Sequence, residues 1–389
     1  MATPSDLLLS LAENGCDSGR QYFARIGSEL LRHAPADLAS AMEDAGARWR
    51  LEPLLFAHFA AKASPDDLWP ILYGYCDENR RPRLMSTPTN QAGVACLPGL
   101  GYLPTGKAAT IVTLSGPSGS QRYTAATDDD AVNTVPAAPA TLGAGHIEVD
   151  RHHHPLFNFL HPGGADDGAT LVAAHLPHLE KALQRLAEIN PPYAALMEAM
   201  TRRVVLFRNP SLNSFASVAS FGAVCLNVLE DDADEVFFIE DLVHQCGHVI
   251  FSALTHEVDA YLAVPAGTPL QTDVAVNEEP RSVYSALHGL FTEAMMNRCF
   301  DLCLDCDGFT QKQKDEILAR FAFIFRRMNF DLLSMRRHDI YTDRGADIYE
   351  ACRQIFEDIY HRRRQELSGQ NFTGQPYTFN YRIFRHHAA

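Results

Sequence analysis

Ile239-Glu-Asp-Leu-Val-His-Gln-Cys-Gly-His-Val-Ile-Phe-Ser-Ala-Leu254 is the stretch on which the interpretation of this 389-residue sequence depends. Its apolar residues recur at helical spacing, so it predicts a buried helix. His244 and His248 are four residues apart, which places both imidazoles on one face of that helix. This is the two-histidine half of a metal site of the HExxH type, with Gln245 in the place of the glutamate.

The glutamine is as informative as the histidines. In a hydrolytic zinc site the glutamate of this motif takes a proton from the metal-bound water, and an uncharged amide cannot do so. Gln245 is therefore a candidate catalytic residue, and it distinguishes the chemistry of this site from that of a hydrolytic zinc site. The sequence predicts a chain that keeps a metal but lacks the usual base for peptide hydrolysis.

A second polar cluster follows on another helical pattern. Pro280 is expected to start that helix, with Glu278 and Glu279 at its positive end. Arg281 and His288 are seven residues apart, so they are expected on one helix face, about 10 Å apart along the axis. With His288 as a third ligand, Arg281 could hold a carboxylate beside the metal, as a chelating keto acid such as 2-oxoglutarate requires. The alternative is an arginine at the helix end and a buried histidine hydrogen-bonded to backbone.

Composition changes along the chain and predicts three regions. Residues 1–80 show helical apolar spacing, whereas residues 81–165 are dense in Gly, Pro, Ser and Thr and include a predicted strand at Ala108–Leu114. The long connection Thr124–Gly145 is expected to be irregular. Helical patterns return in residues 166–389. The predicted fold class is α+β, with a helical N-terminal region, a β-rich middle and a metal-binding half with a helical C-terminal part.

Strands are predicted just before the two-histidine helix. Arg203–Phe207 has the composition of a strand, and Phe215–Val228 that of a second strand or a bent hairpin. Strands packed against a metal-binding helix are typical of zincin-like folds. By this analogy residues 166–389 are predicted to form a zincin-like catalytic domain. Ser217 and Ser220 would then be candidates for hydrogen bonding from a wall of the cleft.

Three blocks of the sequence resemble a known family. They are Ser217-Val-Ala-Ser-Phe-Gly-Ala-Val-Cys-Leu226, Leu242-Val-His-Gln-Cys-Gly-His248 and Glu279-Pro-Arg-Ser-Val-Tyr-Ser-Ala-Leu-His-Gly289. The second block is similar to Leu-Val-His-Glu-x-x-His, and the third to Asp-Pro-Arg-Pro followed by Leu-His-Gly. These patterns are typical of the HExxH-motif peptide-modifying proteins, 2-oxoglutarate-dependent peptide β-hydroxylases of natural-product clusters. The resemblance covers about residues 195–300.

The resemblance implies a specific set of site residues. Fe(II) would be bound by His244, His248 and His288, and Arg281 would receive the carboxylate of the co-substrate 2-oxoglutarate. The reaction would be hydroxylation of a side chain within a peptide, at Cβ. The chain departs from the family pattern at Gln245 and at Ser282. The first departure harms an oxygenase less than a hydrolase, because hydroxylation needs no carboxylate base from the protein.

Composition limits the partners and the compartment. A formal charge of −15 with a pI near 5.5 argues against nucleic acid and is compatible with a peptide or small-molecule substrate. No apolar run approaches the roughly 20 residues that a membrane span needs. Nine scattered cysteines indicate reduced thiols, so a cytoplasmic location is expected.

Two other motifs have alternative interpretations. Cys299-Phe-Asp-Leu-Cys-Leu-Asp-Cys306 has a spacing that can hold an iron–sulfur cluster, but its helical pattern favours buried thiols that pack as small apolar groups. Asp150-Arg-His-His-His-Pro155 predicts an exposed turn, or alternatively the rim of a cleft.

Two other function classes stay open at this stage. The first is a zinc metallopeptidase-like protein, active or decayed, in which Glu293 or another carboxylate replaces the missing base. The second is a non-catalytic peptide-binding protein that keeps the fold.

Overall fold

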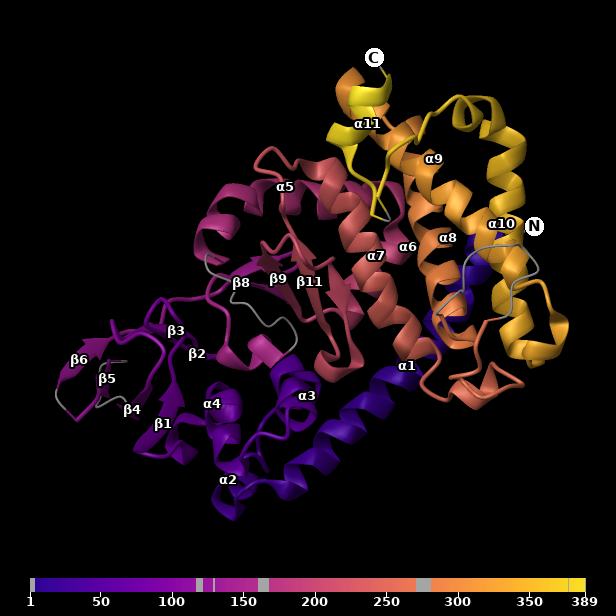
Figure 1. The fold of residues 1–389 in the computed structure, drawn as a ribbon. Coiled ribbons are helices and arrows are strands. Elements are labelled where there is room, and N and C mark those ends of the chain that lie inside the picture. The colour runs from indigo at the N-terminus through magenta and orange to yellow at the C-terminus, as the bar shows by residue number, and fades with distance from the viewer. Residues whose placement is uncertain are drawn as a thin grey trace. The chain divides into compact units, whose positions relative to one another are not determined.

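The computed structural model describes residues 4–116, 122–128, 130–159, 168–270, 281–376 and 378–388. In these ranges the protein is a mixed structure of helices and strands with helical N-terminal and C-terminal regions, as predicted (Figure 1). Two compact units are each built from separate stretches of the chain. The first unit comprises residues 1–20, 178–200 and 233–389, and the second comprises residues 21–177 and 201–232.

The elements have the following bounds. The α-helices are α1 (Pro4–Leu30), α2 (Ala36–Ala41), α3 (Pro53–Ala60), α4 (Leu68–Leu72), α5 (Gly168–Ile189), α6 (Pro191–Met200), α7 (Glu235–Leu254), α8 (Val283–Asp305), α9 (Gln311–Ser334), α10 (Asp343–Ser368) and α11 (Tyr381–Ala388). The strands are β1 (Leu84–Pro88), β2 (Val94–Leu97), β3 (Gly101–Pro104), β4 (Ile111–Ser115), β5 (Tyr123–Ala126), β6 (Ala131–Thr134), β7 (Ala140–Leu142), β8 (Ile147–Asp150), β9 (Arg203–Phe207), β10 (Phe215–Ala216) and β11 (Ala223–Asn227). Within the described ranges we find no helix with the length and apolar character of a membrane span.

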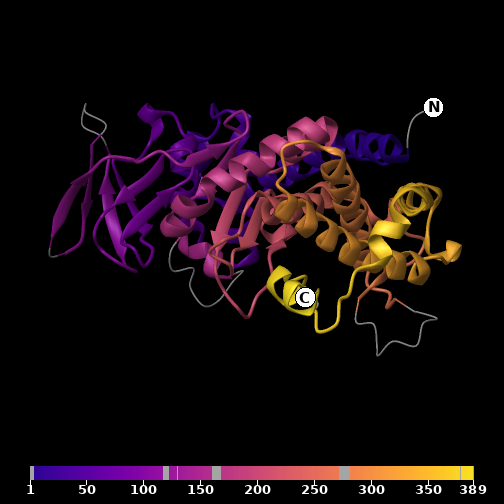
Figure 2. The same ribbon diagram turned by 90° about the horizontal axis from the view of Figure 1, so that it is seen from above.

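The first unit is a group of long helices. Helix α8 packs against both α7 and α9, and α10 packs against α8 and α9 (Figures 1 and 2). Each of the four begins at a side chain that caps its free backbone N–H groups. These N-caps are Asp234 for α7, Ser282 for α8, Thr310 for α9 and Thr342 for α10.

Helix α1 lies unusually close to the end of α7 within this unit. A Cβ atom at Gly19 would overlap the backbone carbonyl of Ala253. Because a backbone atom cannot turn away as a side chain can, only glycine allows this separation.

We therefore expect Gly19→Ala to destabilise the first unit. Overpacking of this kind costs about 1–3 kcal/mol, which outweighs the gain in helix propensity. Urea unfolding followed by far-UV circular dichroism would measure it. The control is Gly46→Ala, because no described atom lies within 4 Å of a Cβ at Gly46. Equal stability of the two variants would contradict the expectation.

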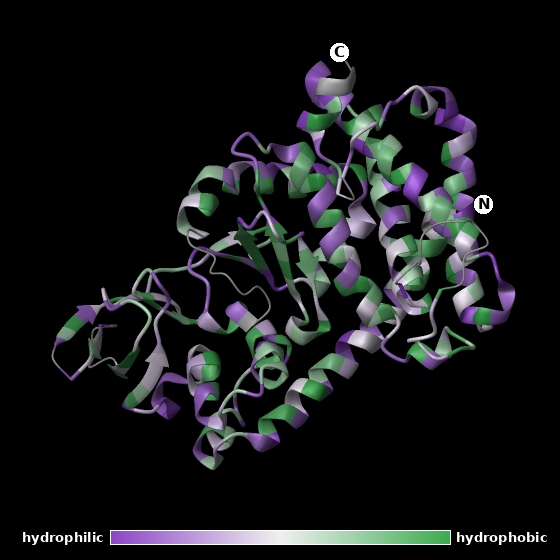
Figure 3. Ribbon diagram, in the orientation of Figure 1, coloured by the Kyte–Doolittle hydropathy of each residue, from purple (hydrophilic) through white to green (hydrophobic). Residues whose placement is uncertain are grey.

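The second unit contains the sheets. A five-stranded sheet has the order β10-β11-β9-β8-β7, with β9 parallel to both of its neighbours. Its central strands β9 and β11 are buried along their whole length and are mostly apolar (Figure 3). A four-stranded antiparallel sheet, β1-β4-β5-β6, and the β2-β3 hairpin complete the unit.

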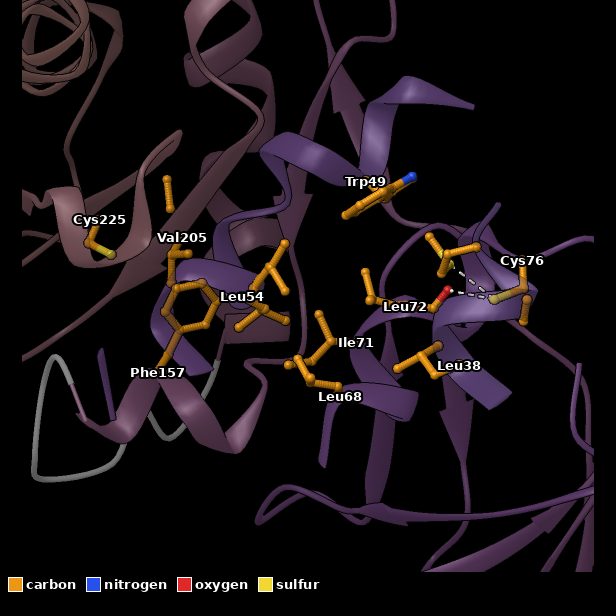
Figure 4. Close-up of a cluster of buried hydrophobic side chains, with 14 of the residues drawn as sticks. Leu38, Trp49, Leu54, Leu68, Ile71, Leu72, Cys76, Phe157, Val205 and Cys225 are labelled. Atoms are coloured by element: carbon orange, nitrogen blue, oxygen red, sulfur yellow. Dashed lines mark hydrogen bonds between the residues drawn. The ribbon is translucent and has the colours of Figure 1, made fainter. Parts of the chain in front are cut away.

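An apolar core joins the helices of the second unit to its five-stranded sheet. Leu54 of α3 and Ile71 and Leu72 of α4 converge with Val205 of β9 and with Phe157 (Figure 4). The chain has two tryptophans, Trp49 and Trp69, and both pack in this cluster. Their fluorescence therefore reports on the folding of this unit.

A buried ionic cluster lies at the start of β9. Arg203 is 5% exposed and contacts three carboxylates. Its guanidinium lies 2.5 Å from Asp150, 3.2 Å from Glu52 and 3.3 Å from Glu148. The Arg203 guanidinium therefore forms ion pairs with three carboxylates at once.

Several strand and helix predictions are confirmed. The strand Arg203–Phe207 is β9, and Phe215–Val228 contains the antiparallel pair β10 and β11, which is the bent hairpin. The strand expected at Ala108–Leu114 is β4, shifted toward its C-terminal end.

Two loop predictions are wrong. Thr124–Gly145 is not irregular, because it contains most of β5 and all of β6 and β7. Tyr123 and Ala125 face the core while their neighbours do not, an alternation too short to stand out in the sequence. The histidine-rich turn is not an exposed loop, since His153 and His154 are 7% and 3% exposed. Asn90 donates a hydrogen bond to the carbonyl of His153, and this contact with a distant segment was not predicted.

Candidate metal centre

Helix α7 carries the two-histidine motif. Sixteen of its residues are buried, so the helix is enclosed on most sides. Its start is fixed by Asp234, whose carboxylate accepts a hydrogen bond from the backbone of Val236 at 2.9 Å. The rings of His244 and His248 lie with their centroids 4.7 Å apart, as the spacing predicts.

The third histidine of the prediction lies beside the second. The ring centroids of His248 and His288 are 4.5 Å apart, and the planes are inclined by 75°. His288 also stacks on Phe251 at 4.7 Å. The structure therefore brings together three imidazoles from α7 and α8, the helices named in the prediction.

All three rings are held in the neutral form that a metal ligand needs. Burial lowers the pKa of His244 well below its usual range, and the neighbouring His248 and Arg327 add to this. Burial lowers the pKa of His248 to about 4 and that of His288 well below 6.5.

Hydrogen bonds determine which ring nitrogens remain available. Nε2 of His288 lies 3.2 Å from the carbonyl oxygen of His248. A carbonyl can only accept, so this nitrogen carries the proton and Nδ1 is left with its lone pair. The backbone hydrogen bond of the alternative interpretation is therefore present, and it still leaves one nitrogen able to bind a metal.

Gln245 is the immediate neighbour of His244 in space as well as in sequence. Its side chain is 1% exposed, and its Nε2 lies 3.3 Å from Nδ1 of His244. Its Oε1 is buried and has no hydrogen-bond partner among the described residues. A half-turn of the amide would bring Oε1 to Nδ1, which would then donate and leave Nε2 of His244 as the bare nitrogen. The amide can thus orient His244 for a metal.

Gly247 has a packing role. A Cβ at this position would lie 3.1 Å from both the Tyr193 hydroxyl and the Thr292 methyl. The Tyr193 hydroxyl donates to the carbonyl of Val243 at 2.8 Å, which ties α6 to α7 at the motif. The glycine therefore lets α6 and α8 approach the helix that carries the histidines.

Arg281 precedes α8 instead of lying on it. The helix starts at Val283 after the cap Ser282, whose hydroxyl accepts from the backbone of Ser285. The predicted helical relation between Arg281 and His288 is therefore wrong. The expected helix start at Pro280, with Glu278 and Glu279, lies outside the described residues.

The guanidinium of Arg281 is held by a carboxylate of the protein itself. It forms two hydrogen bonds with Asp331 of α9, at 2.6 and 2.7 Å, and Asp331 is 2% exposed. This is the bidentate geometry that a carboxylate ligand would adopt. An incoming carboxylate would have to displace Asp331 or share the arginine with it.

A second acid lies near this pair. Glu293 is 3% exposed and lies 3.4 Å from Nε of Arg327. Burial and the nearby Asp331 raise the pKa of Glu293 well above its usual range, which outweighs the opposite effect of Arg327 and Arg281. Sequence reasoning missed Asp331 and Arg327, since an Arg and an Asp four residues apart on a helix usually form a surface pair.

Ser217 and Ser220 belong to the second unit, where Ser217 caps a short 3-10 turn and Ser220 is 1% exposed. Their role as cleft-wall residues stays a prediction. Cys299 and Cys303 are buried on α8, and burial raises the thiol pKa of both, so they pack as apolar groups.

In the described part of the chain, no group of three or more His, Cys, Asp and Glu side chains is placed so that it could hold a metal ion. The donor chemistry nevertheless fits one, because three neutral imidazoles adjoin and an unpartnered amide oxygen lies beside them. The chain matches no protein-family model and no curated protein.

Proposed function

We propose that this protein is a mononuclear iron, 2-oxoglutarate-dependent oxygenase that hydroxylates a side chain of a peptide, at Cβ, in natural-product biosynthesis. The observation that carries the proposal is the meeting of His244, His248 and His288 from two helices. Three nitrogen ligands leave positions for a chelating keto acid and for dioxygen. In this proposal residues 166–389 form a zincin-like catalytic half.

The chain's own residues would have distinct tasks. His244, His248 and His288 would hold Fe(II), which supplies oxidative chemistry once 2-oxoglutarate and dioxygen are bound. Gln245 would orient His244 through Nδ1 and would accept no proton, which suits a reaction that needs no carboxylate base. Arg281, held in place by Asp331, would receive the co-substrate carboxylate.

Succinate formation tests the proposal. We expect the purified protein, loaded with Fe(II) without oxygen and then given 2-oxoglutarate and air, to release succinate even without its peptide. Tightly bound zinc with peptide cleavage would instead support a metallopeptidase, with Glu293 as the base. Absence of metal binding would leave a non-catalytic peptide-binding protein, and either result would overturn the oxygenase.

The orienting role of Gln245 gives a separate prediction. Gln245→Ala should lower iron affinity or succinate formation about tenfold to a hundredfold, because outer partners of metal-bound histidines have effects of this size. Gln245→Glu should leave the fold intact and retain binding, since a carboxylate can also accept from Nδ1. Unchanged succinate formation by Gln245→Ala would show that the amide has no part in the site.

A further inference from the structure

The second unit contains a pocket at its ionic cluster, whereas the three histidines of the candidate metal centre belong to the first unit. It has an empty volume of about 270 Å³ including its open mouth, and its enclosed part admits only a group of about the size of a water molecule. Polar lining residues are Glu148, Asp150, His154 and Arg203, and apolar ones include Leu54 and Leu97. Glu148 and Asp150 lie on β8 and Arg203 lies on β9, so the sheet fixes three of the four polar residues. His154 follows β8 by four residues.

The pocket has an excess of negative charge. Arg203 is shared by Glu52, Glu148 and Asp150, and Arg48 also acts on Glu148. Asp150 also accepts from the Tyr102 hydroxyl at 3.1 Å, and Glu52 from Tyr75 at 2.6 Å. Among the described residues, the Glu148 carboxylate pairs with Arg203 and accepts no tyrosine hydrogen bond of the kind that Asp150 and Glu52 accept. It is thus the carboxylate best able to accept a further positive group.

Two buried donors of the same pocket lack acceptors. Nε of Arg203 and Nε2 of His154 have no hydrogen-bond partner among the described residues. Nδ1 of His154 accepts from the backbone of Leu156 at 3.1 Å, so in the neutral ring Nε2 carries the hydrogen. His154 and Arg203 are 3% and 5% exposed, and an unmet donor at such depth is costly. An acceptor oxygen of a ligand, placed near Glu148 and Asp150, would therefore satisfy the two unmet donors.

We propose that this pocket binds a primary ammonium group with a carbonyl oxygen close to it, as found at the N-terminus of a peptide. The ammonium group would pair with Glu148, and the carbonyl oxygen would accept from Arg203 and His154. The enclosed part admits one group of the size of the carbonyl oxygen, and the ammonium group would meet Glu148, which is 17% exposed, in the open part. The site would give the protein a second contact with a peptide, independent of any metal.

Titration calorimetry of the full chain with glycinamide tests the proposal. Glycinamide carries the ammonium group and the carbonyl, N-acetylglycinamide lacks the charge, and ethylamine lacks the carbonyl. We expect glycinamide to bind in the millimolar range and both other compounds to bind at least about tenfold more weakly. If ethylamine bound as tightly as glycinamide, the carbonyl contact would be overturned. The preference for a peptide N-terminus over a lysine side chain would be overturned with it. Equal binding of N-acetylglycinamide, or no heat from any compound, would overturn the site and leave a structural cluster bridged by water.

A substitution at Glu148 shows whether glycinamide binds in this pocket or elsewhere on the protein. Glu148→Gln keeps the shape of the side chain and removes its charge, so glycinamide should bind about tenfold more weakly. Glu78→Gln is the matched control, because Glu78 is exposed in the same unit. Tryptophan fluorescence would verify that both variants are folded. Unchanged binding by a folded Glu148→Gln variant would refute the proposal.

Discussion

Replacing His288 by alanine is expected to lower the affinity for Fe(II) by at least about a hundredfold, because a site with three imidazoles would lose one ligand outright. The effect should exceed that of any change at Gln245, which would touch the metal only through His244. Anaerobic competition against a chromogenic chelator would measure it. The visible absorption that forms when 2-oxoglutarate chelates Fe(II) should disappear with the bound metal.

The control must separate ligation from packing, since His288 stacks on Phe251 at 4.7 Å. His288→Phe keeps a ring against Phe251 but offers no nitrogen, so it should lose iron as fully as the alanine variant. His338 is an exposed histidine of the same unit, and His338→Ala should bind iron as the parent does. Normal iron binding by His288→Phe would end the three-histidine proposal.

The sequence predicted the parts of the site that depend on local periodicity. The positions of His244 and His248 follow from a spacing of four on a helix, and α7 follows from its apolar pattern. The proximity of His288 came from motif order and the resemblance, and the structure brings its ring to 4.5 Å from that of His248.

The parts that escaped prediction depend on contacts between distant segments. Arg281 was expected on a helix to hold a ligand, but Ser282 starts the helix after it and Asp331, fifty residues later, takes its guanidinium. Likewise, Arg203 and Glu52 are 151 residues apart, and no local pattern links them. Charged residues read from sequence are assigned to the surface, and only the fold shows which of them are buried.

Arg203→Met is expected to produce the largest loss of stability, about 3–5 kcal/mol at neutral pH. The variant keeps much of the side-chain volume but leaves the buried Glu52 and Asp150 and the partly buried Glu148 without their shared cation. Breaking a buried ion cluster from one side costs this much. Urea unfolding followed by tryptophan fluorescence would report it, because both tryptophans lie in this unit.

Arg208→Met is the matched control for this loss. Arg208 lies just past the end of β9, is 40% exposed and pairs with Asp231, which is 88% exposed. A solvent-exposed pair of this kind contributes about 0–1 kcal/mol. A similar loss of stability in the two variants would show that burial of the Arg203 cluster has no energetic consequence.

The loss of unfolding free energy caused by Arg203→Met should become smaller as the pH falls. Burial raises the pKa of Glu148 above its usual value. Arg203 opposes this rise, while Glu52 and Asp150 add to it, so loss of the guanidinium would raise the pKa further. An acid whose pKa is higher in the folded than in the unfolded state binds its proton more readily when folded, so acidification favours folding and a rise in pH opposes it. The difference in unfolding free energy between variant and parent should therefore be largest at neutral pH and narrow as the pH falls toward about 5. A difference that stays constant or widens in acid would mean that Glu148 does not depend on Arg203 for its charge.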